Sequence, residues 1–490
     1  MKLLKPRVFI FLMLLAGCCF LSTCTYEKAT PTFNGYPDEV GKLIYTKCAT
    51  AGCHTDASKE AAGGLSMESW ESLFKGGHSG AAVIPYRSDF STMCYFTNTF
   101  SDLGTIIGPT MPYGRTPLTR DEVLLLKNWI DAGAPSKENF VKFSDNPNRS
   151  KYYVTNQGCD VVTVFDAESG LQMRMINVGQ TAGTEAPHMV RVSPDKKYWY
   201  VLSLDGLYLE QYSTTTDQLT GKANIGPGYW NAFTISSDSH TAYCSDMSDI
   251  SSGKVAIVNL DALTSYTLQP FNYPHGMALD AADDTLYITQ QVGSSQLYKV
   301  PIADFSALSN VNLYTGTPPV LYLNPHEVIF SPDHSKYFVT CQSSSDVRIF
   351  ETGTDRLLAI IPVGASPTEM SFSLHSNNLF VTCTEDTLTF PGQRGSVAVI
   401  DYMSNTFKKA IYTGWQPHGI VVDDERNLVI VANRNFSTDG PAPHHANACG
   451  GRNGYVTFID INTLETVKNF TGTADKKIEV SVDPYSVAKK

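Results

Sequence analysis

The chain has 490 residues, a hydrophobic share of 42% and a formal net charge of −11 at pH 7. That length has room for one small and one large domain, and the apolar share suffices for ordinary cores. The acidic balance argues against nucleic acid, and against an anionic membrane face, as a binding partner. The chain contains 11 cysteines, and their scattered positions do not indicate a disulfide scaffold.

The N-terminal residues are typical of an export signal. Basic residues precede an apolar run from Val8 to Ala16, which is too short to span a bilayer as a mature helix. Small residues lead directly into Cys18, and this arrangement resembles the bacterial lipoprotein signal. The resemblance implies a signal peptide over residues 1–18, a lipid on Cys18 and a membrane-anchored protein in the periplasm or at the cell surface. A plain secretory signal is the alternative, and residues 19–35 are interpreted as a tether.

Two cysteines and a histidine stand close together in the run CATAGCH at residues 48–54. Each thiol can add to a haem vinyl group, and the histidine that follows can bind the haem iron. Four residues separate Cys48 from Cys53, where two are usual. A disulfide and half of a zinc site are the alternatives, but no second ligand pair follows at the spacing that zinc needs. The run therefore predicts one covalently bound haem c.

A helix is predicted from Thr119 to Trp129, with Thr119 as N-cap, acids in the first turn and apolar residues at helical spacing. Met111 stands directly before a proline in the loop ahead of this helix. Class I cytochromes c place the distal iron ligand at such a position. Residues 36–136 therefore resemble the small cytochrome c domain of the planctomycete type, which implies an all-α fold.

The resemblance also assigns roles to four residues. Cys48 and Cys53 would form the thioethers, His54 would be the proximal ligand, and Met111 would be the sixth ligand. Met93 and His78 are rival sixth ligands, and a methionine buried in the core is the alternative interpretation of Met111.

From about residue 140 the chain repeats a unit of short strands joined by tight turns. The stretches 146–155 (NPNRSKYYVT) and 331–340 (SPDHSKYFVT) illustrate it. Units of this kind, recurring about every 40 to 50 residues, predict an all-β propeller over residues 140–490. The repeat is similar to that of YVTN-type propellers, a resemblance that says little about function.

The blades can be counted by their innermost strands. The marker positions are His188, Asn231, His275, His326, Thr368 and His418, and a seventh innermost strand stands at the C-terminus, at residues 484–488. This last strand has no following turn, whereas the first unit lacks an innermost strand. We therefore expect seven blades, with the two chain ends completing one blade so that no sheet edge stays open.

A proline followed by histidine begins four innermost strands, at His188, His275, His326 and His418. The insertion at residues 435–453 adds His444 and His445. Imidazole is a ligand for copper, iron, nickel and zinc, so a second metal site with copper or another transition metal is one interpretation. Structural or solvated histidines, and a small-molecule or anion site, are the others.

Two known arrangements bear on the metal interpretation. A histidine-rich copper cluster at a propeller axis resembles nitrous-oxide reductase, and a propeller paired with a cytochrome c domain resembles the haem-containing nitrite reductases. The sequence departs from the first in having no cupredoxin domain. The remaining ring positions are Asn231, Thr368 and Tyr485.

Two functional classes follow. In the first, an exported haem c protein passes electrons between a redox partner protein and a site or partner at the propeller mouth, which would make it an oxidoreductase. In the second, the propeller is a binding module for a surface ligand or protein, with an accessory haem domain. No Ser/His/Asp arrangement, phosphate loop or spaced carboxylate pair stands out, which argues against a hydrolase. The catalytic residues of any enzyme activity are not identified by these patterns.

Overall fold

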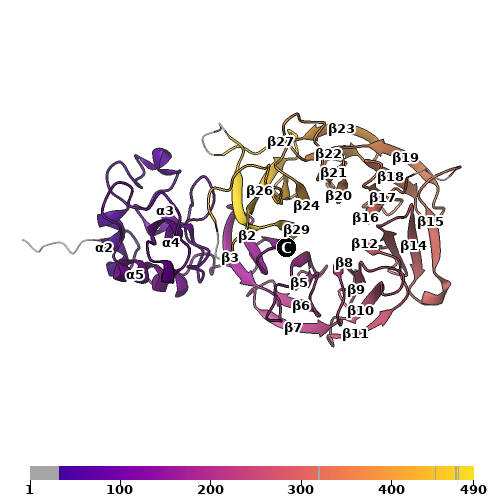
Figure 1. The fold of residues 1–490 in the computed structure, drawn as a ribbon, viewed down its shortest axis with the longest axis horizontal. Coiled ribbons are helices and arrows are strands. Elements are labelled where there is room, and N and C mark those ends of the chain that lie inside the picture. The colour runs from indigo at the N-terminus through magenta and orange to yellow at the C-terminus, as the bar shows by residue number, and fades with distance from the viewer. Residues whose placement is uncertain (1–31, 318–320, 447–448, 470–471, 473) are drawn as a thin grey trace, which may run out of the picture.

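The computed structural model describes residues 32–490 except 318–320, 447–448, 470–471 and 473. The predicted signal peptide, its Cys18 and nearly all of the predicted tether lie outside the described residues. Figure 1 shows a small N-terminal region of helices and loops beside a large ring of β-sheets. Within the described part, no helix combines the length and hydrophobicity needed to cross a bilayer.

Residues 32–150 contain short helices joined by long loops. The helix predicted after Thr119 is present, and it begins with a capping box in which Thr119 Oγ1 accepts from the Glu122 amide and the Glu122 carboxylate accepts from the Thr119 amide. Loops make up much of this region, so its architecture is sparser in helix than the predicted all-α domain. The helices are α2 (Asp38–Lys47), η1 (Lys59–Ala62), α3 (Trp70–Leu73), α4 (Thr92–Thr97), η2 (Ser101–Leu103) and α5 (Arg120–Asp131).

The predicted seven-bladed propeller is confirmed, since seven antiparallel sheets surround a central channel. Blade 1 contains β29 (Pro484–Lys489), β1 (Lys151–Asn156), β2 (Val161–Asp166) and β3 (Leu171–Asn177). Blade 2 contains β4 (Pro187–Val192), β5 (Tyr198–Ser203), β6 (Tyr208–Ser213) and β7 (Leu219–Asn224). Blade 3 contains β8 (Trp230–Ile235), β9 (Thr241–Asp246), β10 (Lys254–Asn259) and β11 (Thr264–Leu268).

The other four blades repeat this order. Blade 4 contains β12 (Pro274–Leu279), β13 (Thr285–Gln290), β14 (Gln296–Pro301) and β15 (Ser309–Asn312), with η3 (Phe305–Ala307) before β15. Blade 5 contains β16 (Pro325–Phe330), β17 (Lys336–Cys341), β18 (Asp346–Glu351) and β19 (Leu357–Pro362). Blade 6 contains β20 (Pro367–Phe372), β21 (Asn378–Cys383), β22 (Ser396–Asp401) and β23 (Thr406–Ile411). Blade 7 contains β24 (Pro417–Asp423), β25 (Leu428–Asn433), β26 (Asn453–Asp460), β27 (Glu465–Thr466) and β28 (Lys477–Val482).

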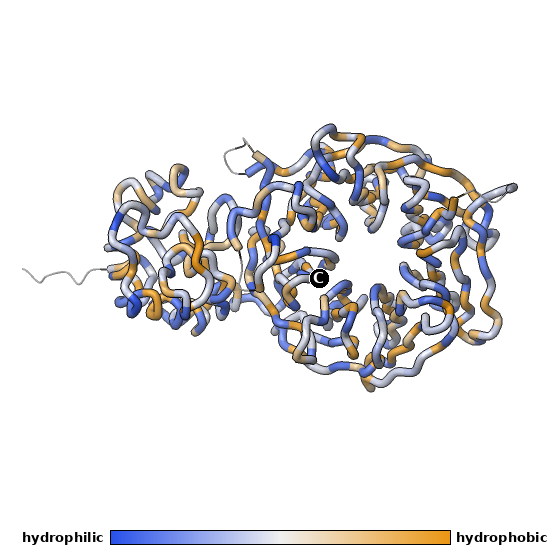
Figure 2. Tube along the Cα trace, in the orientation of Figure 1, coloured by the Kyte–Doolittle hydropathy of each residue, from blue (hydrophilic) through white to orange (hydrophobic). Residues whose placement is uncertain are grey.

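Packing between blades follows from the strand sequences. Side chains of alternating strand positions point to opposite faces of a sheet, and both faces of every blade meet a neighbouring blade. Buried β-branched and aromatic residues consequently dominate the second and third strands, as in β25, where Val429, Ile430 and Val431 are fully buried. Figure 2 shows the hydrophobic stretches that run through the blades.

The ring closes where blade 7 meets blade 1. The last strand, β29, pairs antiparallel with β1 and completes blade 1 from the C-terminus. Asp423, at the end of β24 in blade 7, reaches across the seam. It accepts hydrogen bonds from Tyr152 Oη at 2.6 Å and from Lys489 Nζ at 2.7 Å. A Cys159–Cys449 disulfide also joins the β1–β2 turn of blade 1 to the insertion of blade 7, and the sequence analysis had not paired these cysteines.

The N-terminal region docks on the outer side of the ring, against blades 1 and 7 (Figure 1). The amide of Ala81 donates to Gln172 Oε1 of β3 at 2.9 Å, and Arg87 donates to the Met175 carbonyl of the same strand at 2.6 Å. One hydrophobic cluster runs from Ile44 and Trp129 of this region to Val164 in blade 1. The two parts of the chain therefore share a continuous core.

Candidate haem-attachment turn and axial cavity

The run at residues 48–54 folds into one compact turn. Cys48 follows the last residue of α2, and the amide of His54 donates to the Cys48 carbonyl at 3.2 Å. Inside this closed turn the amide of Cys53 donates to the Thr50 carbonyl at 2.9 Å. Both thiols are unpaired in the structure. The four-residue gap between the cysteines is thus accommodated by hydrogen bonds of the turn itself.

The His54 side chain has a fixed tautomer. Its Nδ1 lies 3.1 Å from the Leu65 carbonyl oxygen, and because a carbonyl only accepts, Nδ1 carries the proton and donates. Nε2 is left with its lone pair, which is the state in which imidazole binds a metal. Burial lowers the pKa of His54, so the ring is neutral at pH 7. The donor set of this turn, two thiols and one oriented imidazole, fits covalent haem.

The three predicted candidates for a sixth ligand lie in different settings. Met111 is half-buried in the loop between η2 and α5, and its amide donates to the Phe96 carbonyl at the end of α4 at 2.7 Å. Met93 is 5% exposed and belongs to the hydrophobic core of the region. His78 Nε2 lies 3.6 Å from a carboxylate oxygen of Glu60.

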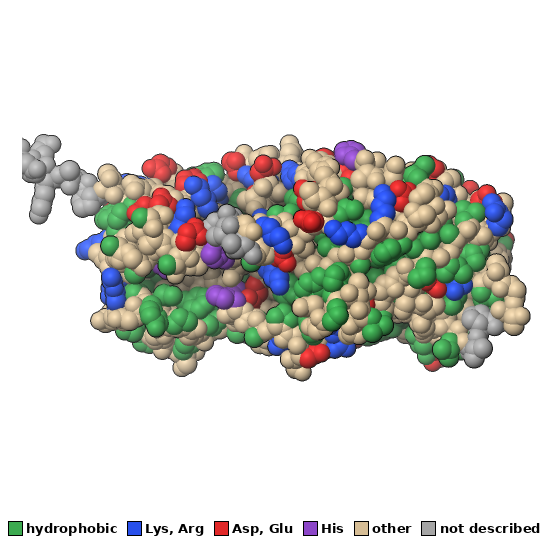
Figure 3. Space-filling view, turned by 90° about the horizontal axis from the view of Figure 1, so that it is seen from above, with side chains coloured by type: hydrophobic (Ala, Val, Ile, Leu, Met, Phe, Trp, Pro, Cys, Tyr) green, Lys and Arg blue, Asp and Glu red, His purple; other side chains and the backbone are tan. Residues whose placement is uncertain are grey.

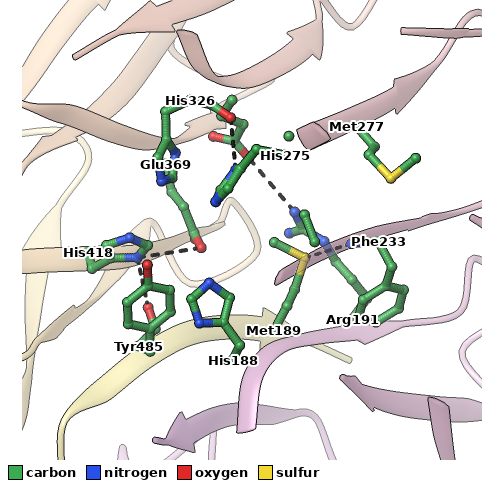
Figure 4. Close-up of a pocket in the computed structure, with 13 residues that line it drawn as sticks. His188, Met189, Arg191, Phe233, His275, Met277, His326, Glu369, His418 and Tyr485 are labelled. Atoms are coloured by element: carbon green, nitrogen blue, oxygen red, sulfur yellow. Dashed lines mark hydrogen bonds and ion pairs between the residues drawn. The ribbon is translucent and has the colours of Figure 1, made fainter. Parts of the chain in front are cut away.

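The structure brings four of the predicted histidines together. Each of them is the second residue of an innermost strand, and the four line one cavity at the end of the channel (Figure 4). They are His188, His275, His326 and His418. The ring centroids of His275 and His326 lie 4.2 Å apart, and those of His326 and His418 lie 5.6 Å apart. Tyr485 of β29 packs against His418 at 3.7 Å and His188 at 4.0 Å between centroids.

These imidazoles join neighbouring blades by hydrogen bonds. Nδ1 of His275 donates to the His326 carbonyl at 3.0 Å, and Nδ1 of His418 donates to the Tyr485 carbonyl at 3.1 Å. Nε2 of these two rings therefore carries a lone pair. His188 accepts at Nδ1 from the Gln157 amide nitrogen at 3.0 Å, so its proton is on Nε2. The bonds between blades support the structural interpretation of the histidines.

Burial keeps all four rings uncharged. It lowers the pKa of His275 to about 4, and it lowers the pKa of His188, His326 and His418 well below the ordinary histidine value, with the neighbouring histidines as a further cause. Protonating one ring would place a charge beside other imidazoles in a buried setting. The four imidazoles of the cavity are therefore neutral at pH 7.

Two glutamates and an arginine that were not predicted from the sequence line the same cavity. Glu327 accepts from the Met370 amide of the next blade, and Glu369 accepts from the Ile420 amide one blade further on at 3.4 Å. Arg191 lies 3.7 Å from Glu327. Burial raises the pKa of both carboxyls, and Glu369 raises that of Glu327 further, while Arg191 opposes both shifts. The repeat could have indicated both glutamates, because each directly follows the marker position of its innermost strand.

The six histidines of the predicted second metal site do not form one cluster. The insertion of blade 7 places His444 and His445 against the N-terminal region, with ring centroids 5.9 Å from Phe96 and 6.0 Å from Tyr95. Their backbone amides donate to the Glu479 carboxylate of β28 at 2.8 and 3.2 Å. The carboxylate holds this pair at the outer side of the ring. The predicted grouping of six histidines therefore separates into four at the axial cavity and two at the outer side of the ring.

The geometry does not support copper or another metal in the propeller. Among the described residues, no three side chains of His, Cys, Asp or Glu are placed to hold one ion. The Nδ1 bonds to the next blade hold the rings of His275 and His418 at their own blade interfaces. The cavity has room for about one water molecule.

Comparison with known protein families finds one match, within the N-terminal region. Residues 51–102 match the family model described as Planctomycete cytochrome C. The match includes Cys53 and His54, begins after Cys48 and ends before Met111. The resemblance to this cytochrome group is confirmed for that stretch.

A structural comparison adds one similar chain. A chain of the hydrazine synthase of Kuenenia stuttgartiensis is similar with a TM-score of 0.48 and 15% sequence identity, over 63% of this chain and 93% of that chain. No curated protein sequence matches this chain.

The raised pKa values of Glu327 and Glu369 predict a pH-dependent stability. The folded state keeps protons on these carboxyls that the unfolded chain has already released, so the free energy of unfolding falls as the pH rises toward their folded pKa values. Above about pH 7.5, where histidines of the unfolded chain are largely neutral, we expect a further loss of up to about 1 kcal/mol. Urea unfolding at a series of pH values measures it.

The double variant Glu327→Gln/Glu369→Gln should lose this part of the pH dependence. Glu465→Gln, at an exposed position of β27, is the matched control and should keep the wild-type slope. Equal slopes in all three proteins would contradict the raised pKa values.

Proposed function

We propose that this chain is an exported c-type haem protein that carries single electrons. Its residues 36–136 form a cytochrome c-like domain that binds one haem through Cys48 and Cys53, with His54 as proximal ligand. The observation that carries the proposal is the oriented His54, whose Nδ1 proton is held by the Leu65 carbonyl at 3.1 Å beside two free thiols. A haem bound there would supply a one-electron iron couple.

Apolar side chains of the N-terminal region support this assignment. Leu65, Phe100, Leu103 and Leu125 are half-buried apolar side chains packed on the core of the N-terminal region. They offer the apolar contacts that a porphyrin needs. A region with short helices and long loops also gains from a large covalent group, because its own secondary structure covers little core.

We propose Met111 as the sixth ligand in preference to its rivals. The bond from its amide to Phe96 fixes the loop that carries it. Met93 already fills the core, and His78 already faces Glu60. Ligation by Met111 would raise the reduction potential relative to a bis-histidine site.

The position of the N-terminal region bears on the route of electron transfer. The N-terminal region docks on the outer strand of blade 1 (Figure 1), whereas the four-histidine cavity lies at the innermost strands. Four strands spaced about 4.8 Å apart place about 14 Å of protein between outer and inner strands. This supports a redox partner protein that meets the N-terminal region directly.

We further propose export to the periplasm or the cell surface, with Cys18 lipidated as a membrane anchor. The Cys159–Cys449 disulfide supports this location, because such bonds persist in oxidising compartments. In bacteria, thioether attachment of haem also takes place outside the cytoplasm.

The haem assignment predicts a covalent complex. The chain made in a strain that matures c-type cytochromes should show a Soret band and keep its haem on a denaturing gel. Cys53→Ser should lose most of the covalent haem, since one thioether attachment point is gone. Cys94→Ala removes a buried cysteine outside the turn and should retain it. Clean wild-type protein without haem would sink both the cofactor and the electron-transfer function.

The ligand assignment predicts a spectroscopic change. Oxidised wild-type protein should show the weak far-red charge-transfer band of methionine–iron ligation, and Met111→Ala should abolish it and lower the reduction potential. Met403→Ala, at an exposed turn of the propeller, should alter neither. A band and potential unchanged in Met111→Ala would transfer the role to Met93 or His78.

The anchor assignment predicts lipid on one cysteine. Labelled fatty acid should be incorporated into the wild-type chain and absent from Cys18→Ala, with Cys24→Ala as the control that keeps it. A mature N-terminus found beyond Cys24 would instead indicate a freely secreted protein.

A further inference from the structure

The propeller packs against α4 of the N-terminal region through two histidines of the blade 7 insertion. His444 lies against Phe96, with the ring centroids 5.9 Å apart. His445 lies against Tyr95, with the ring centroids 6.0 Å apart. Both separations are in the range of favourable ring packing. Figure 3 shows histidine side chains at the surface along the boundary between the N-terminal region and the ring.

The same two residues of α4 support the loop that carries the proposed sixth ligand. We call residues 104–119 the ligand loop, and they form neither helix nor strand. The amide of Met111 donates to the Phe96 carbonyl at 2.7 Å, and the amide of Ile107 donates to the Tyr95 carbonyl at 3.2 Å. A loop without secondary structure of its own depends on such bonds for its position. The side chains that contact the propeller therefore belong to the residues that hold the ligand loop.

One buried carboxylate of the propeller fixes both histidines. Glu479 of β28 is 8% exposed, and its Oε2 accepts from the His444 amide at 2.8 Å. Its Oε1 accepts from the His445 amide at 3.2 Å and from Asn453 Nδ2 at 2.8 Å. Hydrogen bonds to a carboxylate are stronger than those between neutral groups. Three donors on one side chain thus fix the height at which the insertion meets α4.

Attachment of the N-terminal region to the ring does not depend on this carboxylate. The amide of Ala81 and the guanidinium of Arg87 donate to Gln172 and to the Met175 carbonyl of β3. A continuous hydrophobic cluster also crosses the boundary. Removing the Glu479 carboxylate should therefore leave the region docked while the support of α4 becomes looser. This separates a positioning role of Glu479 from simple docking.

We propose that Glu479 is a positioning residue for the sixth haem ligand, and that it acts through the two histidines and α4 on the ligand loop. The inference rests on the haem and the methionine ligation of the proposed function. Met93, the rival methionine, belongs to α4 itself, so the same contact would position it as well. Groups behind a metal ligand orient it and tune the metal.

This role gives the propeller a part in electron transfer without a redox centre of its own. The contact with α4 would hold the methionine sulfur against the iron, and the strength of that bond contributes to the reduction potential. The blade 7 insertion would then serve the haem region, whereas the axial cavity at the innermost strands takes no part.

The test measures how fast added imidazole replaces the methionine in the oxidised, haem-loaded full chain. At saturating imidazole the rate is limited by opening of the methionine–iron bond, so it reports how firmly the ligand loop is held. Glu479→Gln keeps the size of the side chain but turns one acceptor oxygen into an N–H donor that faces a backbone amide. We expect the rate to rise at least about tenfold, with a weaker far-red band. His444→Ala, at an exposed position, should leave the fold unaffected and raise the rate in the same direction.

Asp386→Asn is the matched control, because Asp386 is a buried carboxylate of blade 6 with a similar set of donors. It is 1% exposed and accepts from the amides of Leu388 and Thr389 at 3.2 and 3.1 Å and from Ser396 Oγ at 2.6 Å. The change from acid to amide is the same, and blade 6 lies away from the N-terminal region (Figure 1). This variant should lose stability by a similar amount and keep the wild-type imidazole rate.

The outcomes separate the positioning role from the proposed function. Wild-type rates in both Glu479→Gln and His444→Ala, in protein that shows the methionine band, would overturn the positioning role alone. An equal rise of the rate in Asp386→Asn would also overturn it, since the effect would then be a general loss of stability. Wild-type protein that holds haem but lacks the methionine band would overturn methionine ligation, and the positioning role with it.

Discussion

Closure of the ring between blade 7 and blade 1 is the constraint on which the rest of this structure depends. Neighbouring blades of a propeller pack side by side without a continuous backbone ladder, so a strand from the far end of the chain can close the ring by completing the first blade. Here β29 does so by pairing with β1. The fully buried Asp423 then ties both of those strands to blade 7 through Tyr152 and Lys489.

The same seam organises both candidate sites. Tyr485 belongs to the closing strand and packs against His418 and His188 in the axial cavity, so that cavity is complete only when the ring is closed. The N-terminal region docks on blades 1 and 7, where Gln172 donates to the Glu479 carbonyl at 2.7 Å and accepts from Ala81. A chain that failed to close would therefore lose the cavity and the dock for the haem region together.

Features that depend on residues close together in the sequence could be predicted, whereas contacts between residues far apart in the sequence could not. The blade count could be read from a repeat that is local in the chain, and the convergence of His188, His275, His326 and His418 follows from their shared place in that repeat. The Cys159–Cys449 bond spans 290 residues, and no local pattern pairs such cysteines. His444 and His445 were grouped with the channel because an insertion carries no periodicity that would show its direction. Glu327 and Glu369 stood beside the marker positions, but their meaning depends on burial, which one sequence does not report.

The first role of the side chains in the axial cavity is structural, because they join neighbouring blades of the ring. From blade 4 round to blade 1, successive innermost strands are joined by a histidine or glutamate of one blade bound to a backbone group of the next. Such bonds satisfy buried polar groups at the crowded centre, where the strands cannot pair with each other. They also leave Nε2 lone pairs on His275 and His418 and titratable carboxyls on Glu327 and Glu369. The groups that remain available to a ligand are therefore determined by the hydrogen bonds that join neighbouring blades. Any change that improved binding there would have to preserve the bonds that hold neighbouring blades together.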